Sequence, residues 1–291
     1  MGEQMKNFFC VAVLCLAAVM IPAAVQGGDK PDGQGVKIHV LGTLSGTEPQ
    51  MGKHHTSWVL ELANGDIYLF DAGENCGRAA YFRGIDLTRL KAVFISHFHA
   101  DHTAGLIHFF AVLSKIRRME KTFPEMKVSV HFPDQAMADV FIPALKAFGA
   151  FPQGIDFSTH LLQHDGSFDD GAVKIKMIGN DHIKVGKDER KRAYSFRIDA
   201  GGRRIIYSGD LKHPAELDKW VKEGCDLLMM ETGHHSSVKI CDRWKNEPVK
   251  HLLFIHHGRE YQAYPFETLR KCRRIWKNKL DFANENTLVE L

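Results

Sequence analysis

Residues 95–102 decide how this sequence is interpreted, and they read Ile95-Ser96-His97-Phe98-His99-Ala100-Asp101-His102. They end an apolar, β-rich run and place four side chains that can bind a metal within six residues. Alternate residues of an extended segment point to the same side, so His97 and His99 can share one ion. Asp101 and His102 turn into the next helix and can serve a second ion nearby. Imidazole and carboxylate ligands together suit zinc, and also manganese or iron.

Strands and single helices alternate around this cluster. Asn64-Gly65 between two β-rich runs is a strong hairpin signal. Strand-rich stretches separated by single helices predict two sheets with helices outside them. We expect strands at Val36–Leu41, Ser57–Leu62, Asp66–Phe70, Ala92–Ser96, Val128–Phe132, Val173–Ile178, Ala193–Ile198, Arg204–Tyr207, Leu227–Met230 and Leu252–Ile255. We expect helices at Thr103–Met119, Asp134–Phe148 with an interruption near Pro143, Ala215–Lys222 and Glu267–Ile275.

The composition is that of a soluble globular protein, with 44% hydrophobic and 25% charged residues in 291. The net charge of +3 is too small to indicate a nucleic-acid partner. No domain break interrupts the sequence after Val36, so residues 36–291 are assigned to one domain. The sequence leaves open whether the cysteines of this domain form disulfides or stay as buried thiols. They are Cys76, Cys225, Cys241 and Cys272.

The first 27 residues have the pattern of an export signal. Lys6 precedes an apolar run over Phe8–Ile21, and small residues follow up to Gly27. The run is short for a membrane span, and an uncleaved N-terminal anchor is the alternative. We expect residues 1–27 to be a signal peptide and residues 28–35 a linker rich in Gly, Asp and Pro. The protein would then be periplasmic or secreted, with no membrane contact beyond this segment.

His-x-His-x-Asp-His at a strand end resembles the signature of the metallo-β-lactamase superfamily. The resemblance runs from about Val36 to Arg259, and further motifs of the superfamily follow in the expected order. They are Phe70-Asp71-Ala72-Gly73, Asn180-Asp181-His182, Tyr207-Ser208-Gly209-Asp210 and Phe254-Ile255-His256. The resemblance implies an α+β fold, the αββα sandwich, in which two sheets pack face to face with helices on the outer faces.

The same resemblance implies two divalent metal ions, with zinc ahead of manganese or iron. His97, His99 and His182 would hold the first ion, Asp101, His102 and His256 the second, and Asp210 would bridge the two. His257 stays open as an alternative to His256, and Asp181 is interpreted as structural. Two cations a few ångströms apart lower the pKa of a shared water toward neutrality. The resulting hydroxide would attack a phosphodiester or a carbonyl.

Within the superfamily, the sequence is most similar to the ribonuclease Z-like phosphodiesterases. Leu41–Gly46 resembles their opening strand and turn, and Asp101–Leu106 resembles their Asp-His-x-x-Gly-Leu motif. Leu44 replaces a glycine of that turn, and the chain between Asp210 and His256 is too short for the inserted arm that grips tRNA. An export signal would also separate the protein from cytoplasmic RNA. We therefore expect a small or nucleotide-like anionic substrate, neither tRNA maturation nor a stable nucleic-acid partner.

Polar residues outside the ligand set are weaker candidates. His235, in Glu231–Ser236, would act as a general acid toward the leaving oxygen, and we assign catalytic roles to it and to Asp101. His54 and His55 would contact substrate from the loop between the first strands. A polar loop is the alternative in both cases. A basic segment after the third histidine forms either a phosphate-attracting pocket mouth or a solvated loop. It contains Lys184, Lys187, Arg190, Lys191 and Arg192.

Three other functions stay open from the sequence. A site of this type also hydrolyses lactones, thioesters or β-lactams. A redox iron centre is a second alternative, although His99 in place of a glutamate argues against the di-iron flavoprotein type. A catalytically silent binding protein is the third, and the retention of every ligand argues against it. The ribonuclease Z-like features favour phosphodiester hydrolysis.

Overall fold

The computed structural model describes residues 35–121, 125–184 and 190–291. The expected signal segment, residues 1–27, lies outside the described residues, and so do the expected linker up to residue 34 and Lys187 of the basic segment. In the described part of the chain, no helix is both long and apolar enough to cross a membrane.

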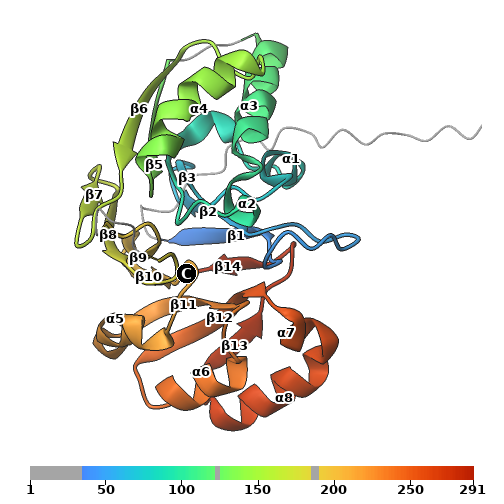
Figure 1. Cartoon of the computed structure of the whole chain (residues 1–291), viewed down its shortest axis with the longest axis vertical. Helices are drawn as coiled ribbons and strands as arrows, with labels where there is room; N and C mark the ends of the chain where they lie inside the picture. The colour runs from blue at the N-terminus through green and yellow to red at the C-terminus, as the bar shows by residue number, and fades with distance from the viewer. Residues whose placement is uncertain (1–34, 122–124, 185–189) are drawn as a thin grey trace, which may run out of the picture. The chain divides into compact units, whose positions relative to one another are not determined.

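The described strands form two seven-stranded sheets that pack face to face (Figure 1). The first sheet has the order β14 (Leu288–Glu290), β1 (Val36–Gly42), β2 (Ser57–Leu62), β3 (Ile67–Phe70), β4 (Leu90–Phe94), β5 (Met126–Phe132) and β6 (Ile155–Leu161). The second has the order β13 (Lys279–Phe282), β12 (Val249–His257), β11 (Cys225–Thr232), β10 (Arg203–Tyr207), β9 (Tyr194–Ala200), β8 (Val173–Gly179) and β7 (Ser167–Asp169).

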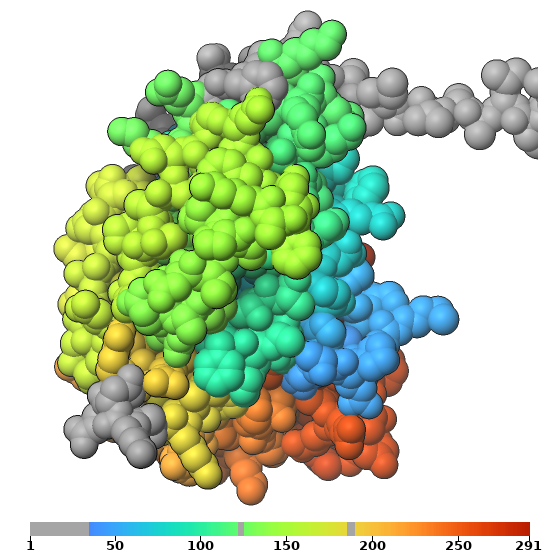
Figure 2. All heavy atoms as spheres, turned by 45° about the horizontal axis from the view of Figure 1, so that its top comes forward, coloured from blue at the N-terminus to red at the C-terminus, as the bar shows by residue number. Residues whose placement is uncertain are grey.

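Helices cover the outer face of each sheet. Those next to the first sheet are α1 (Cys76–Phe82), η1 (Leu87–Arg89), α2 (Ala100–Thr103), α3 (Leu106–Glu120) and α4 (Gln135–Ala147). Those next to the second are η2 (Pro214–Leu217), α5 (Asp218–Glu223), α6 (Ser237–Trp244), α7 (Arg259–Ala263) and α8 (Pro265–Ile275). In Figure 2 the green residues of α3 to β6 make up the upper part of the face shown, and the orange and red residues lie below them. The architecture is the αββα sandwich that the sequence predicts.

Alternation along the strands explains why three apolar layers form. On β1, Val36, Ile38 and Val40 point between the sheets into a core shared with β9 and β10. Leu41 instead joins the layer beneath α1, α3 and α4, and a third apolar layer fills the space under α5, α6 and α8. Strands β3 to β6 run parallel, and so do β10 to β13. The carboxyl ends of parallel strands meet at one edge, which is where polar loops can converge.

Two expected helices differ from the structure. Helix α4 continues through Pro143, where an interruption was expected. Proline has no backbone N–H, so the Asp139 carbonyl one turn earlier has no helical donor. Both residues are exposed, so water can hydrogen-bond to that carbonyl instead. The expected helix Thr103–Met119 is broken at Gly105 into α2 and α3. A side chain at Gly105 would collide with the carbonyl oxygen of Gly73, at 2.1 Å, so this close approach between the two segments requires a glycine.

Candidate metal centre

The candidate site lies where the loops after β4, β8, β10 and β12 meet. The segment after β4 carries His97 and His99, and the short helix α2 presents Asp101 and His102. A side chain at Gly209, just before Asp210, would come within 2.5 Å of the Tyr194 carbonyl oxygen, and φ there is +53°. Glycine therefore lets the chain turn so that Asp210 enters the site. The structure brings together all seven ligands expected from the sequence: His97, His99, Asp101, His102, His182, Asp210 and His256.

The first ligand group contains three imidazoles. Nε2 of His97 lies 3.0 Å from Nδ1 of His99, which lies 3.4 Å from Nε2 of His182. With one oxygen of Asp210, these nitrogens lie within 4.8 Å of one another. Asn180 fixes the third histidine, because its side-chain oxygen accepts the His182 backbone N–H at 3.0 Å. Three ring nitrogens and a carboxylate facing one point form the donor set that suits a zinc-like divalent ion.

The second ligand group lies next to the first. Nε2 of His256 is 3.3 Å from Oδ2 of Asp101, and Nε2 of His102 is 3.6 Å from the same oxygen. The backbone N–H of Gly46 donates to that oxygen at 2.6 Å, which brings the β1–β2 loop against the site. All three ligands of this group are buried.

Asp210 joins the two groups through different oxygens. Its Oδ1 lies 3.4 Å from Nε2 of both His102 and His256. Its Oδ2 lies 3.6 Å from Nε2 of both His97 and His182. Among the described residues, Oδ1 of Asp210 and Nε2 of His102 are buried without a hydrogen-bond partner. Such orphaned atoms are costly unless something else satisfies them, and a metal ion between the groups would do so.

A bulge selects His256 over its neighbour. Ile255 pairs with Glu231 and His257 with Thr232, so His256 is the extra residue, with φ of 49°. His257 points the other way and donates from Nε2 to the Ala283 carbonyl oxygen at 2.8 Å. The structure therefore brings His256, and not the alternative His257, to the cluster.

Asp71 orients His102, a member of the second ligand group. Its Oδ2 accepts from Nδ1 of His102 at 2.8 Å, which leaves Nε2 of that ring facing Asp210. The backbone N–H and the hydroxyl of Ser96 also donate to this carboxylate, at 2.6 and 2.8 Å, and the Tyr207 hydroxyl donates to it as well. A carboxylate behind a ligating histidine fixes the tautomer and the ring orientation. The early Asp-x-Gly turn thus has a positioning role.

His234 is the site residue that the sequence reasoning missed. Its Nδ1 lies 3.1 Å from Oε1 of the buried Glu231 and 3.8 Å from Oδ2 of Asp210. Its ring stacks on that of His256, with centroids 5.7 Å apart. By contrast, Nε2 of His235 donates to the Leu211 carbonyl oxygen at 3.0 Å. The structure therefore places His234 against the ligand cluster, and His235, the expected general acid, beside it.

Burial and neighbouring charges shift the pKa values of the ligands in opposite directions. Burial, together with His102, lowers the pKa of His97 well below its ordinary value. Burial is the largest effect on His102 and His256 and opposes their charged forms. Asp210 outweighs it only together with other carboxylates, Asp71 for His102 and Asp101 and Glu231 for His256, so both pKa values are raised, that of His256 to about 9. Since imidazole binds a metal only as the neutral ring, an ion would take the place of these protons.

The weaker candidates from the sequence do not belong to the ligand groups. His54 is 3.3 Å from Glu74, and His55 pairs with the same carboxylate. In the basic segment, Lys191 pairs with Asp181. Nε of Arg192 lies 3.5 Å from Oδ2 of Asp134, and Lys184 is exposed. The four cysteines of the domain are buried free thiols.

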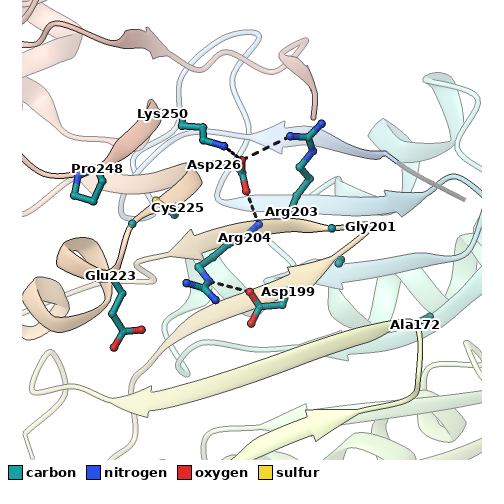
Figure 3. A pocket seen from close by; sticks show the side chains of 13 residues that line it. Ala172, Asp199, Gly201, Arg203, Arg204, Glu223, Cys225, Asp226, Pro248 and Lys250 are labelled. Atoms are coloured by element: carbon teal, nitrogen blue, oxygen red, sulfur yellow. Dashed lines mark hydrogen bonds and ion pairs between the residues drawn. The ribbon is translucent and has the colours of Figure 1, made fainter.

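A cavity of about 580 Å³ opens beside the ligand cluster. Its walls are Ser45–Glu48 from the β1–β2 loop, 232–236 after β11, and 258–260 at the start of α7. A second cavity, of about 760 Å³, lies at the opposite end of the second sheet (Figure 3). Its charged side chains pair with one another, as Arg204 does with Asp199 and Lys250 with Asp226, at 2.9 and 2.8 Å. We therefore take the first cavity, beside the ligand groups, as the candidate substrate site.

The fold and the paired ligand groups define a metal-dependent hydrolase. The chain belongs to the β-lactamase superfamily, whose domain model matches residues 67–259. Ribonuclease Z of Myxococcus xanthus is 24% identical over 304 residues, covering 88% of this chain and 98% of that protein. YhfI, a metallo-β-lactamase fold protein from Bacillus subtilis, superposes with a TM-score of 0.64 at 16% identity, covering 89% of this chain and 100% of its own. A diphosphatase from the PhnP family gives 0.60 at 18% identity, covering 88% and 97%. These two structural likenesses show the shared fold alone.

Proposed function

We propose that the protein is an exported, binuclear phosphodiesterase that acts on a small anionic substrate. The arrangement of Asp210 carries this proposal, because each of its oxygens faces a different ligand group. One bridging carboxylate between two sets of donors is the arrangement that holds two divalent ions a few ångströms apart. Such ions, zinc first and manganese or iron as alternatives, would acidify a water and polarise the scissile bond.

The residues of this chain would orient the substrate in the cavity beside the cluster. Arg259 lines that cavity with a side chain that is 88% exposed, 3.3 Å from Glu48. A guanidinium at this place can bind the phosphate oxygens of a substrate. His234, at the edge of the ligand cluster, is placed to give a proton to the departing oxygen.

The size of the cavity favours a small substrate over tRNA, although relatives such as the M. xanthus protein are named ribonuclease Z. The cavity of about 580 Å³ has the volume of a small-ligand site. Residues 211–255, between the last two ligands, are taken up by η2, α5, β11, α6 and β12. A fold neighbour described as a diphosphatase agrees with hydrolysis of a phosphate-containing substrate on this scaffold.

A hydrolysis panel on the metal-loaded protein tests the proposal. We expect about two metal ions per chain and the highest kcat/KM on bis(p-nitrophenyl) phosphate or a cyclic nucleotide. A lactone, a cephalosporin and a precursor tRNA are the comparison substrates, and chelator-treated protein is the control. The proposal would be wrong if one ion per chain sufficed for full activity. It would also be wrong if a comparison substrate were hydrolysed most efficiently.

Export is tested separately from catalysis. The apolar run over Phe8–Ile21, followed by small residues, leads us to expect cleavage that leaves a mature N-terminus between Val25 and Asp29. N-terminal sequencing of protein from its native host would show this start. Intact Met1 on soluble cytoplasmic protein would contradict export, and intact Met1 on membrane-bound protein would indicate the anchor.

A further inference from the structure

The C-terminal segment after β13 contacts the loop between β1 and β2. This loop, residues 43–56, reaches out from the two sheets (Figure 1). Its residues Ser45–Glu48 form one wall of the candidate substrate cavity. The backbone N–H of Gly46 donates to Oδ2 of the ligand Asp101 at 2.6 Å. The position of the loop therefore sets both the cavity wall and the surroundings of a metal ligand.

Glu285 holds the two arms of this loop together. Its Oε1 accepts a hydrogen bond from the hydroxyl of Thr43, on the outgoing arm, at 2.7 Å. Its Oε2 lies 3.0 Å from Nζ of Lys53, on the returning arm. Thr43 is fully buried and the Glu285 side chain is only 14% exposed, so salt screens these contacts much less than it screens a surface pair. One carboxylate thus ties together two points of the chain on either side of the cavity-wall residues.

His257 anchors the same loop from β12. Its backbone N–H donates to the Thr43 carbonyl oxygen at 2.6 Å, and the Ser45 hydroxyl donates to the His257 carbonyl oxygen at 3.0 Å. The Nε2 of His257 in turn donates to the carbonyl oxygen of Ala283, two residues before Glu285. The C-terminal segment therefore holds the loop twice, directly through Glu285 and indirectly through His257.

We propose that Glu285 is a positioning residue of the metal centre. It holds the loop so that Gly46 keeps its hydrogen bond to Asp101 and the cavity wall stays in place. That bond orients Oδ2 of Asp101, which lies 3.3 Å from Nε2 of His256 in the second ligand group. Loss of a group that orients a ligating carboxylate typically costs about 10–100-fold in metal affinity. The inference rests on the metal centre of the proposed function, and it adds a residue outside the ligand groups and the cavity walls.

Zinc binding to the metal-free protein tests this role without any substrate. In Glu285→Ala, we expect the affinity for one of the two ions to fall about tenfold while the affinity for the other stays that of the wild type. Calorimetric titration measures both steps, and native mass spectrometry counts the ions. Glu285→Gln keeps an oxygen for the Thr43 hydroxyl, so it should recover most of the lost affinity. Glu290→Ala is the matched control and should bind zinc as the wild type does, because this C-terminal carboxylate is 69% exposed and 3.9 Å from Lys37.

Variants of the ligands identify the route of the effect. In an Asp101→Ala background the loop has no carboxylate to orient, so adding Glu285→Ala should leave the remaining zinc affinity unchanged. In a His182→Ala background, which damages the first ligand group, the tenfold loss should persist. At saturating zinc, Glu285→Ala should raise KM for bis(p-nitrophenyl) phosphate more than it lowers kcat, because the cavity wall is displaced while the ligands remain.

Two results would overturn the proposal. One is Glu285→Ala protein of native circular dichroism that binds both ions as the wild type does. The other is an equal loss of affinity at both ions that Glu285→Gln does not recover, which would mark a general structural defect. If Glu285→Ala does not fold, Thr43→Val and Lys53→Met each remove one contact of the carboxylate, and unchanged zinc binding in both would equally overturn the proposal. A wild-type protein that binds one ion only would contradict the proposed function, and the variants would then be compared at that ion.

Discussion

The Asp210→Ala variant is expected to lose both metal ions and to hydrolyse phosphodiesters several orders of magnitude more slowly. Each oxygen of this buried carboxylate faces a different ligand group, so one substitution removes a donor from both. It also removes the shared anion that screens two neighbouring cations from each other. Elemental analysis after reconstitution, together with turnover of bis(p-nitrophenyl) phosphate, measures both effects.

Two further variants separate this effect from misfolding and from general loss of charge. Asp210→Asn keeps the shape of the side chain and removes its charge, so it should also lose metal while its circular dichroism stays native. Asp181→Ala removes a nearby carboxylate that is exposed and pairs with Lys191. It should keep both ions and most of the rate. If Asp210→Ala retained one ion at full occupancy, Asp210 would not bridge two sites.

The sequence predicts the sheets well wherever apolar residues alternate or run together. The strand Ser57–Leu62 has the bounds of β2, and Asn64-Gly65 makes the hairpin to β3, where the Asn64 side chain accepts the Asp66 backbone N–H. Edge strands were missed, because an exposed strand needs no apolar pattern. Residues 158–160 in β6 are all exposed and polar. Helix α1 was missed because it is short and starts after Asn75 without a side-chain cap.

Strand alternation predicted that His97 and His99 share one side, and the rest of the ligand set followed from the resemblance of the later motifs to the metallo-β-lactamase superfamily. The sequence could not decide where that alternation fails. At the bulge in β12 one extra residue turns His256 into the site and His257 away from it. After β11 the chain leaves the sheet, so no alternation rule tells which of His234 and His235 faces inward. The orientation there depends on the buried Glu231, which accepts the His234 backbone N–H at 2.9 Å. That contact spans three residues and follows no strand alternation, so it leaves no periodic signal in the sequence.

The His234→Ala variant should keep both metal ions and lose about 10²–10⁴-fold in rate on substrates with poor leaving groups. Nδ1 of His234 bonds to Glu231, and this hydrogen bond raises the pKa of the imidazole, so the ring holds a proton up to a higher pH than an ordinary histidine. The ring stands beside Asp210 and His256 at the wall of the cavity, where a departing oxygen would lie. A nitrophenolate leaves readily without a proton, so bis(p-nitrophenyl) phosphate should be nearly spared while an alkyl phosphodiester is not.

His235→Ala is the matched control for this role. It removes the neighbouring imidazole, whose Nε2 is engaged by the Leu211 carbonyl oxygen. A ring held in that way cannot reach the leaving oxygen, so His235→Ala should lower the rate to a similar, small extent on every substrate. The opposite ranking of the two variants would return the role of general acid to His235. Loss of metal from His234→Ala would instead make His234 a ligand, since its Nδ1 lies with Asp210 and His256 in a third possible donor group. Because leaving-group dependence and metal content are measured on the same protein, proton donation and ligation give different results for one substitution.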